Sequence, residues 1–177
     1  MFARITLAIL TALILGAAVS FIQPTAAQSS DRIRTVVWND ANCDGVRQDS
    51  EALIPNLTLT LRWAGANGTI DATDRDIEQA GSLVGQYAFT LAAAGEPYFI
   101  SFRNEDKPAG MVPAPFRQGS DPARDNDLTM PLTGTSLWAT PVFTMPADGA
   151  MVTGIDLGLC TPTFDPANTV YLPSLRR

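Results

Sequence analysis

The sequence predicts an all-β fold, organised as a single antiparallel β-sandwich of about seven strands. Apolar and polar residues alternate with a period of two in several stretches, as they do in a strand with one buried face. Turns containing Gly and Pro separate these stretches, and no apolar pattern of helical period is sustained after residue 27. Short strands joined by such turns are typical of an antiparallel sandwich.

The clearest strand is expected at residues 57–63, where every odd position is apolar and every even position is polar. This alternation places Trp63 on the buried face. Similar patterns predict further strands, at residues 34–38, 85–91, 98–102 and 152–159. Residues 73–80 could form one or two helical turns.

The first 27 residues predict a secretory signal peptide. Arg4 precedes an apolar run and small residues end the segment, so cleavage is expected between Ala27 and Gln28. An uncleaved anchor is the alternative, because the run approaches the roughly 20 residues that span a bilayer. Residues 28–160 are then expected to form one secreted, extracellular domain without a further transmembrane segment, and residues 161–177 an extended tail.

The composition excludes several classes of function. The chain has no histidine, which excludes histidine-based acid–base catalysis and histidine metal ligation. A serine or cysteine nucleophile would therefore lack its usual base, and the sequence predicts a protein that is not an enzyme. The net charge of -6 at pH 7 also argues against nucleic acid as a partner, since that would require clustered basic residues.

Residues 40–51 match the twelve-residue calcium loop D-x-[DN]-x-[DN]-G-x5-E at every specified position. Calcium takes six to eight oxygen ligands, and this spacing can gather several of them around one ion. The expected oxygens come from Asp40, Asn42 and Asp44, from the Val46 carbonyl, from a water near Gln48, and from both carboxylate oxygens of Glu51.

An unoccupied polar turn is the alternative interpretation of this loop, since Asn, Asp and Gly are also common turn formers. An EF-hand would need amphipathic helices on both sides of the loop. Here a strand-like run precedes it, and an alternating strand follows Pro55. The loop is therefore expected to connect two strands.

Cys43 lies inside this loop, and Cys160 lies at the end of the last predicted strand. Export permits a disulfide between them. Such a bond would stabilise the fold by about 4 to 5 kcal/mol in the chain-entropy model. Two buried free thiols are the alternative, because the sequence does not show whether the pair lies within bonding distance.

These residues together resemble the SdrD B-like domains, the B-type domains of serine-aspartate-repeat adhesins. The resemblance spans about residues 34–159 and is carried, in order, by residues 37–45, 51–61, 85–89 with 95–98, 119–127 and 156–159. It implies a prealbumin-like or Ig-like sandwich with calcium-binding loops at one end, and a structural or adhesive role at the bacterial cell surface, where the partner would be a protein or a glycan. It also implies further candidate ligands in a second acidic segment, namely Asp121, Asp125 and Asp127.

The alternative function is a secreted carbohydrate-binding module with structural calcium. Such a module usually needs aromatic side chains that face solvent. Trp38 and Trp63 fall on the apolar faces of their strands, which leaves Trp138 and Phe116 as candidates for a platform.

Overall fold

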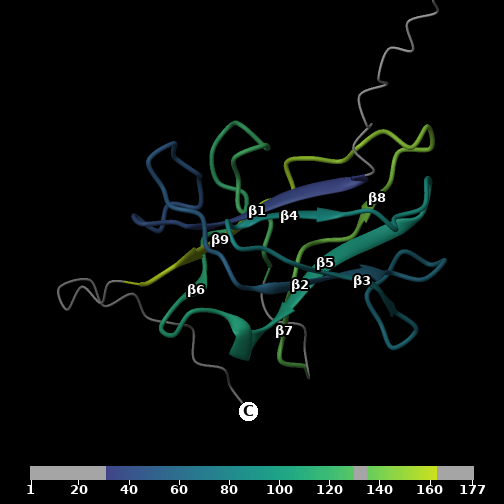
Figure 1. The fold of residues 1–177 in the computed structure, drawn as a ribbon, viewed down its shortest axis with the longest axis horizontal. Helices are drawn as coiled ribbons and strands as arrows, with labels where there is room; N and C mark the ends of the chain where they lie inside the picture. The colour runs from purple at the N-terminus through teal and green to yellow at the C-terminus, as the bar shows by residue number, and fades with distance from the viewer. Residues whose placement is uncertain (1–30, 130–134, 163–177) are drawn as a thin grey trace, which may run out of the picture.

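The computed structural model describes residues 31–129 and 135–162, which fold into a β-sandwich (Figure 1). The strands of these residues are β1 (Ile33–Asn39), β2 (Thr58–Trp63), β3 (Arg75–Gly81), β4 (Gln86–Phe89), β5 (Pro97–Arg103), β6 (Val112–Pro113), β7 (Leu137–Ala139), β8 (Phe143–Thr144) and β9 (Leu157–Cys160). A short 3-10 helix, η1 (Asn104–Asp106), is the only helical segment in the described part of the chain. The predicted all-β sandwich is confirmed.

Two sheets form the layers of the sandwich. One has the strand order β4-β1-β9-β6, and the other has the order β3-β2-β5-β7, with β8 also paired to β5. The sandwich is not purely antiparallel as predicted, because β1 and β9 run parallel, with Val37 opposite Leu157. The loop before β9 returns the chain to the start of β1, where Ile33 pairs with Val152, so β9 must run in the same direction as β1.

The hydrophobic core lies between the two sheets, as the period-two alternation predicts. Its buried side chains come from both inner faces and include Ile33, Val37, Tyr87, Phe89, Leu157 and Leu159 from the first sheet, and Leu59, Leu61, Tyr98, Ile100 and Phe102 from the second. Trp63 packs against this core but is only partly buried, and its indole Nε1 donates a hydrogen bond to the Glu96 carboxylate at 2.7 Å.

A second buried contact lies in the first sheet, where Trp38 packs over Gly158 of the neighbouring strand. The two residues are opposite each other in the β1–β9 pair, and Trp38 is 0% exposed. A Cβ atom on residue 158 would lie 2.6 Å from Cζ2 of the indole, which is shorter than any real contact. Gly158 is therefore required for the indole to lie flat on the sheet.

Two predicted elements differ in the structure. The segment proposed for helical turns is instead the edge strand β3, which pairs with β2 from end to end apart from a register shift opposite Leu61 and Arg62. The last strand begins only at Leu157, because Val152 forms an isolated bridge and the chain leaves the sheet between these two residues. The signal peptide, its cleavage site and most of the predicted tail lie outside the described residues.

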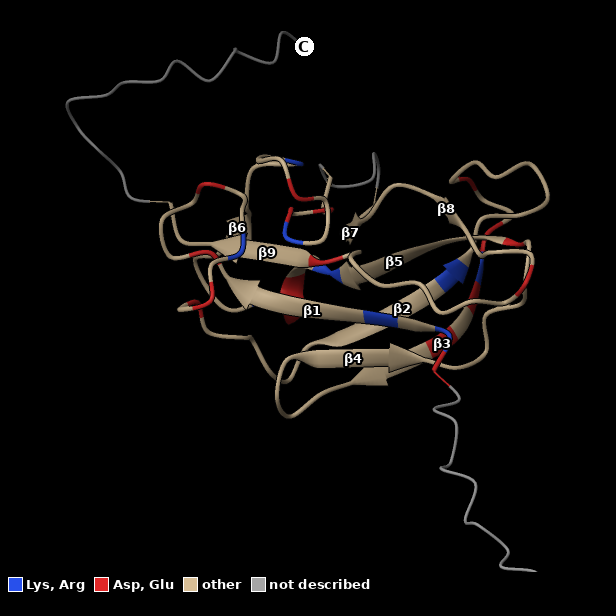
Figure 2. Ribbon diagram, turned by 90° about the horizontal axis from the view of Figure 1, so that it is seen from above, with Lys and Arg blue, Asp and Glu red and all other residues tan. Residues whose placement is uncertain are grey.

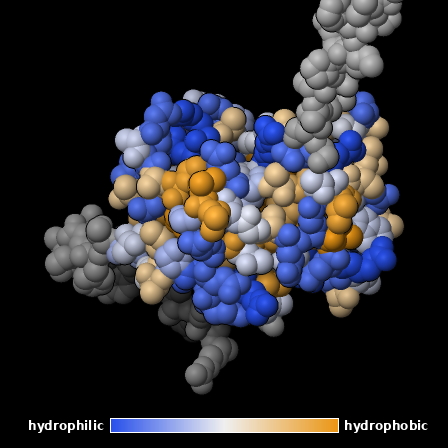
Figure 3. Space-filling view, viewed as in Figure 1, coloured by the Kyte–Doolittle hydropathy of each residue, from blue (hydrophilic) through white to orange (hydrophobic). Residues whose placement is uncertain are grey.

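The acidic residues are distributed unevenly over the sandwich. Asp and Glu gather in the loops at the two ends of the sandwich, whereas the strands carry few of them (Figure 2). The face seen in Figure 3 is mostly hydrophilic, and its apolar surface forms small separate patches. Within the described ranges, no helix has the length and apolar character that a membrane span requires.

Candidate metal-binding site

The predicted calcium loop connects β1 to β2 at one end of the sandwich. Its first residue, Asp40, is 0% exposed, and its backbone amide donates a hydrogen bond to the Leu159 carbonyl of β9. The Asp40 carboxylate accepts hydrogen bonds from the amides of Asp44, at 3.2 Å, and Gly45, at 2.7 Å. The loop therefore folds back around this side chain.

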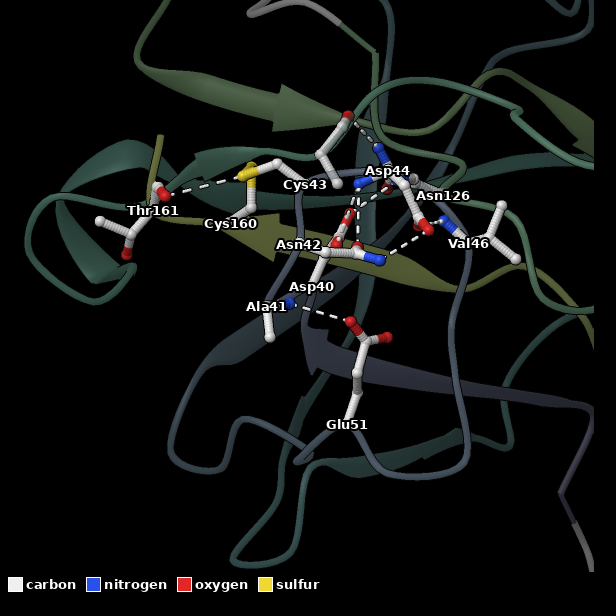
Figure 4. The surroundings of a disulfide bond; sticks show 12 residues. Asp40, Ala41, Asn42, Cys43, Asp44, Val46, Glu51, Asn126, Cys160 and Thr161 are labelled. Carbon is white, nitrogen blue, oxygen red and sulfur yellow. Dashed lines mark hydrogen bonds between the residues drawn. A yellow bond between two sulfur atoms is a disulfide. The ribbon is translucent and has the colours of Figure 1, made fainter. Parts of the chain in front are cut away.

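Asn42 and Asp44 lie beside Asp40 (Figure 4). The Asp44 amide donates to the Asn42 side-chain oxygen at 3.2 Å as well as to Asp40, so one N–H group holds both oxygens. The Asp44 carboxylate accepts from the side-chain amides of Asn42, at 2.8 Å, and Gln48, at 2.9 Å. Desolvation is the largest single effect on this carboxylate and raises its pKa, but the hydrogen bonds from the Val46 amide, Gln48 and Asn42 together outweigh it and lower the pKa of Asp44 below its usual value.

Glu51 lies on the other side of the loop. One carboxylate oxygen accepts from the Ala41 amide and the other from the Gln48 amide, both at 2.9 Å. These bonds join the beginning of the loop to its end. In this structure Glu51 therefore closes the loop through backbone amides, rather than through contact with Asp40 or Asp44.

Two residues of the loop have a backbone conformation with positive φ. Gly45, at φ 79°, lies against the neighbouring segment, where a Cβ atom would stand 2.3 Å from the Pro115 carbonyl oxygen. Only glycine fits there without moving backbone atoms. Cys43 has φ 55° although it carries a Cβ atom, and its side chain points away from the carboxylates toward β9 (Figure 4).

Cys43 forms a disulfide with Cys160 at the end of β9. Their Cα atoms are 5.4 Å apart, within the usual range for a disulfide, and the two residues are 117 positions apart in sequence. Of the two alternatives that the sequence left open, a disulfide or two buried free thiols, the structure shows the disulfide.

The second acidic segment, residues 119–127, lies against the calcium loop, and its three aspartates make different contacts. Asp125 faces Val46 across an antiparallel bridge. Asp127 pairs with Arg117 at 3.1 Å and accepts from the Asp156 amide at 3.2 Å. Asp121 is exposed and caps its own turn by accepting from the Ala123 amide.

Asn126, between two of these acids, is a buried residue that the sequence analysis missed. It is 0% exposed, and its side chain bonds the Ala114 carbonyl at 2.6 Å and the Gly158 amide at 2.9 Å. Its own amide donates to the Gly45 carbonyl at 3.0 Å. Asn126 therefore links the calcium loop, β9 and the segment after β6. The sequence analysis named its neighbours Asp125 and Asp127 as candidate ligands, but nothing in the sequence pattern marks Asn126 as buried.

Asp156 is the second residue that the sequence analysis missed as a site residue. Its carboxylate accepts the Val36 amide of β1 at 3.1 Å and pairs with the Arg47 guanidinium of the calcium loop at 3.4 Å. Burial raises the pKa of Asp156 to about 6, with a further contribution from nearby Asp127, against the lowering effect of Val36 and Arg47. In the sequence, the only sign of this role is the position of Asp156 directly before the apolar strand β9.

The fit of a metal ion can be judged from these contacts. Among residues 31–129 and 135–162, no group of three or more His, Cys, Asp or Glu side chains could hold a metal ion as they stand. The loop's donors are not acids alone, however, and the side-chain oxygens of Asp40 and Asn42 meet at the Asp44 amide. Asp125 is 8% exposed, and its Oδ1 is buried with no hydrogen-bond partner. This donor chemistry fits a hard cation such as calcium.

Comparison with known proteins identifies the family of the chain. The SdrD B-like domain profile matches residues 31–157. A serine-aspartate repeat-containing protein F of Staphylococcus epidermidis is 32% identical over 136 residues, which cover 76% of this chain and 6% of that protein. A fibrinogen-binding protein of Staphylococcus epidermidis is 34% identical over 91 residues, or 51% of this chain and 7% of that protein.

The chain thus spans only a small part of the length of these relatives. The matched family is one of structural adhesin domains and not one of enzymes. The matched residues run from just before β1 into β9 and include the calcium loop and the second acidic segment. The chain belongs to the SdrD B-like domain family.

Proposed function

We propose that this protein is a calcium-binding structural or adhesive module that acts outside the cell, at the cell surface. The observation that carries the proposal is the gathering of oxygens from Asp40, Asn42 and Asp44 in one loop. The spacing of these residues is that of a calcium loop, and the loop is held rigidly between β1, β9 and the second acidic segment.

In this proposal the ion is held by the loop residues expected from the sequence, which are Asp40, Asn42, Asp44, the Val46 carbonyl, Gln48 through a water, and Glu51. Calcium supplies positive charge to a loop rich in carboxylates. The donors to the Asp44 carboxylate within the loop are the side-chain amides of Asn42 and Gln48 and the backbone amide of Val46, all of them neutral. A divalent cation interacts more strongly with a carboxylate than these neutral donors do.

The second acidic segment is proposed to contribute to the same ion or to a neighbouring one. Asp125 is the strongest candidate, because one of its oxygens is buried without a hydrogen-bond partner, and such a group is costly to bury. Asp127 is a weaker candidate, since Arg117 already neutralises it. Asp121 is a weaker candidate still, because its carboxylate is exposed and already accepts a hydrogen bond from the Ala123 amide in its own turn.

Calcium binding would serve the module by stabilising its folded state. An ion that binds the folded loop and not the unfolded chain adds about 2.7 kcal/mol of stability at a hundredfold excess over the dissociation constant. A module stiffened in this way can hold or present a surface to a partner. Since one relative is named a fibrinogen-binding protein, a protein at the cell surface is the partner class that we propose.

Isothermal titration calorimetry of the demetallated protein with calcium tests the proposal, together with melting curves in calcium and in excess EDTA. We expect binding, a higher melting temperature with calcium, and greater protease sensitivity of residues 39–53 in EDTA. Asp44→Asn keeps the side-chain shape but removes a charged ligand, so it should weaken binding by about tenfold or more.

The matched control is Asp148→Asn, which removes one carboxylate charge from an exposed turn between β8 and β9. It should bind calcium as the wild type does. Absence of calcium-binding heat in the wild type, together with identical melting curves in calcium and in EDTA, would refute the proposal.

One observation favours the carbohydrate-binding alternative. Phe116 and Trp138 come from different parts of the chain but line one apolar groove of about 580 Å³. Aromatic side chains that share a groove can stack on sugar rings. Glycan-array binding that is lost in Trp138→Ala, and retained when Phe143 of β8 is replaced by Ala, would support this function; no binding to any glycan would exclude it.

A further inference from the structure

We infer that the Cys43–Cys160 disulfide sets the calcium affinity of the loop, so that a dithiol reductant releases calcium from the protein. The inference deepens the proposed function and rests on it. Its basis is the position of Cys43, which lies between two of the proposed ligands, Asn42 and Asp44, and is covalently joined to the end of β9.

The first half of the loop is tied to β9 at two points. The Asp40 amide donates to the Leu159 carbonyl at 2.9 Å, and the disulfide holds Cys43 to the next residue along, Cys160. The other half is tied to the second acidic segment, where the Arg47 amide donates to the Arg124 carbonyl. The disulfide is therefore the covalent bond that holds the loop to β9 between Asn42 and Asp44, and the other contacts named here are hydrogen bonds.

The backbone conformation at Cys43 is the second observation behind the inference. Cys43 has φ 55°, a left-handed conformation that residues with a Cβ atom adopt rarely. The residues on either side are the proposed ligands Asn42 and Asp44, which hold each other: the Asp44 amide donates to the Asn42 side-chain oxygen, and the Asn42 side-chain amide donates to the Asp44 carboxylate. Once the sulfur bond is broken, Cys43 can relax to negative φ, and this relaxation moves the two neighbouring ligands.

Calcium must then order the loop when it binds, whereas the oxidised loop is already ordered. Ordering a segment on binding lowers affinity, because its conformational entropy is lost in the same step. When one event at a protein site changes the affinity of a second site for its ligand, the change is typically about 5- to 150-fold. We expect the reduced protein to bind calcium more weakly by a factor in this range.

The chemistry of release is ordinary thiol–disulfide exchange. Cys43 is partly exposed, whereas Cys160 is 3% exposed, and both line the wall of the apolar groove that contains Trp138. A thiolate of the reductant attacks the Cys43 sulfur, the S–S bond breaks, and Cys160 leaves as a thiolate that takes up a proton. The second thiol of the reductant then attacks the mixed disulfide, which frees Cys43 as a thiol and leaves the reductant as a disulfide.

The first experiment compares calcium affinity by calorimetry in the oxidised wild type and in Cys43→Ser/Cys160→Ser, with circular dichroism to verify that both are folded. The double variant should bind about 5- to 150-fold more weakly. A dithiol reductant should lower the affinity of the wild type and leave that of the variant unchanged. If the oxidised wild type and the variant bind with equal affinity, the inference fails while the proposed function stands.

The second experiment needs no variant and remains decisive if the double variant does not fold. Because coupling is reciprocal, saturating calcium should raise the dithiol-to-disulfide ratio needed for half-reduction of the wild type by the same factor. Reduction that proceeds equally with and without calcium overturns the inference. If the oxidised wild type binds no calcium at all, both the inference and the proposed function are overturned.

Discussion

Replacing both cysteines by serine should destabilise the domain strongly, even when no calcium is present. The disulfide joins residues 117 positions apart, so it closes almost the whole described chain into one loop. In the chain-entropy model, a loop of this length contributes about 5 kcal/mol, because the cross-link removes conformations from the unfolded state. Small domains are stable by only about 5 to 15 kcal/mol, so this is a large share of the total.

Urea unfolding in excess EDTA, followed by tryptophan fluorescence, measures this effect without a contribution from metal. The Cys43→Ser/Cys160→Ser variant should unfold at a much lower midpoint, and its m-value should rise, because an unfolded chain without the cross-link exposes more surface. The wild type, reduced and alkylated after unfolding, controls for the serine substitutions. An unchanged midpoint for the variant would refute the reasoning, since it would mean that the bond constrains the two states equally.

Three further predictions concern single positions and use the same unfolding assay. Gly45→Ala should cost about 2 to 4 kcal/mol, because its Cβ would stand 2.3 Å from the Pro115 carbonyl oxygen at φ 79°; a neutral effect would contradict the loop packing. Gly158→Val should lower the free energy of unfolding by about 1 to 3 kcal/mol and shift the fluorescence emission of Trp38, whose ring the new side chain would displace. For Asp156, the folded-state pKa of about 6 lies above the unfolded value, so the folded state holds the proton more tightly, and this residue's contribution to stability falls as pH rises from about 4 to 6. The loss is on the order of 3 kcal/mol, and Asp156→Asn should remove it; identical pH profiles for variant and wild type would contradict the assignment.

The period-two alternation was sufficient to predict the class of fold. In β2, the pattern places Leu59 and Leu61 on the inner face, and both are 0% exposed. The alternation does not identify β3, because its sequence RDIEQAG has too few apolar residues to show a period. This strand lies at the edge of its sheet and is mostly exposed, so burial does not constrain its side chains.

The residues of the candidate site differ in how far the sequence pointed to them, and the metal ion itself stays a prediction. The spacing of Asp40, Asn42 and Asp44 identified the loop, because all of its donors are close together in sequence. The buried link through Asn126 and the pairing of Asp156 with Arg47 could not be predicted in the same way. Both depend on segments that are far apart in the chain and meet only after the sheets have formed.

The sequence by itself determined the local features of this protein, namely the alternation of its strands, the calcium-loop spacing and the membership of its family. Only the tertiary structure decided that Cys43 and Cys160 bond, that β9 runs parallel to β1, and that the second acidic segment packs on the loop. The physical reason is that short-range patterns reflect the period of a strand and the reach of a loop. Long-range pairings depend on where the whole chain places its segments in space.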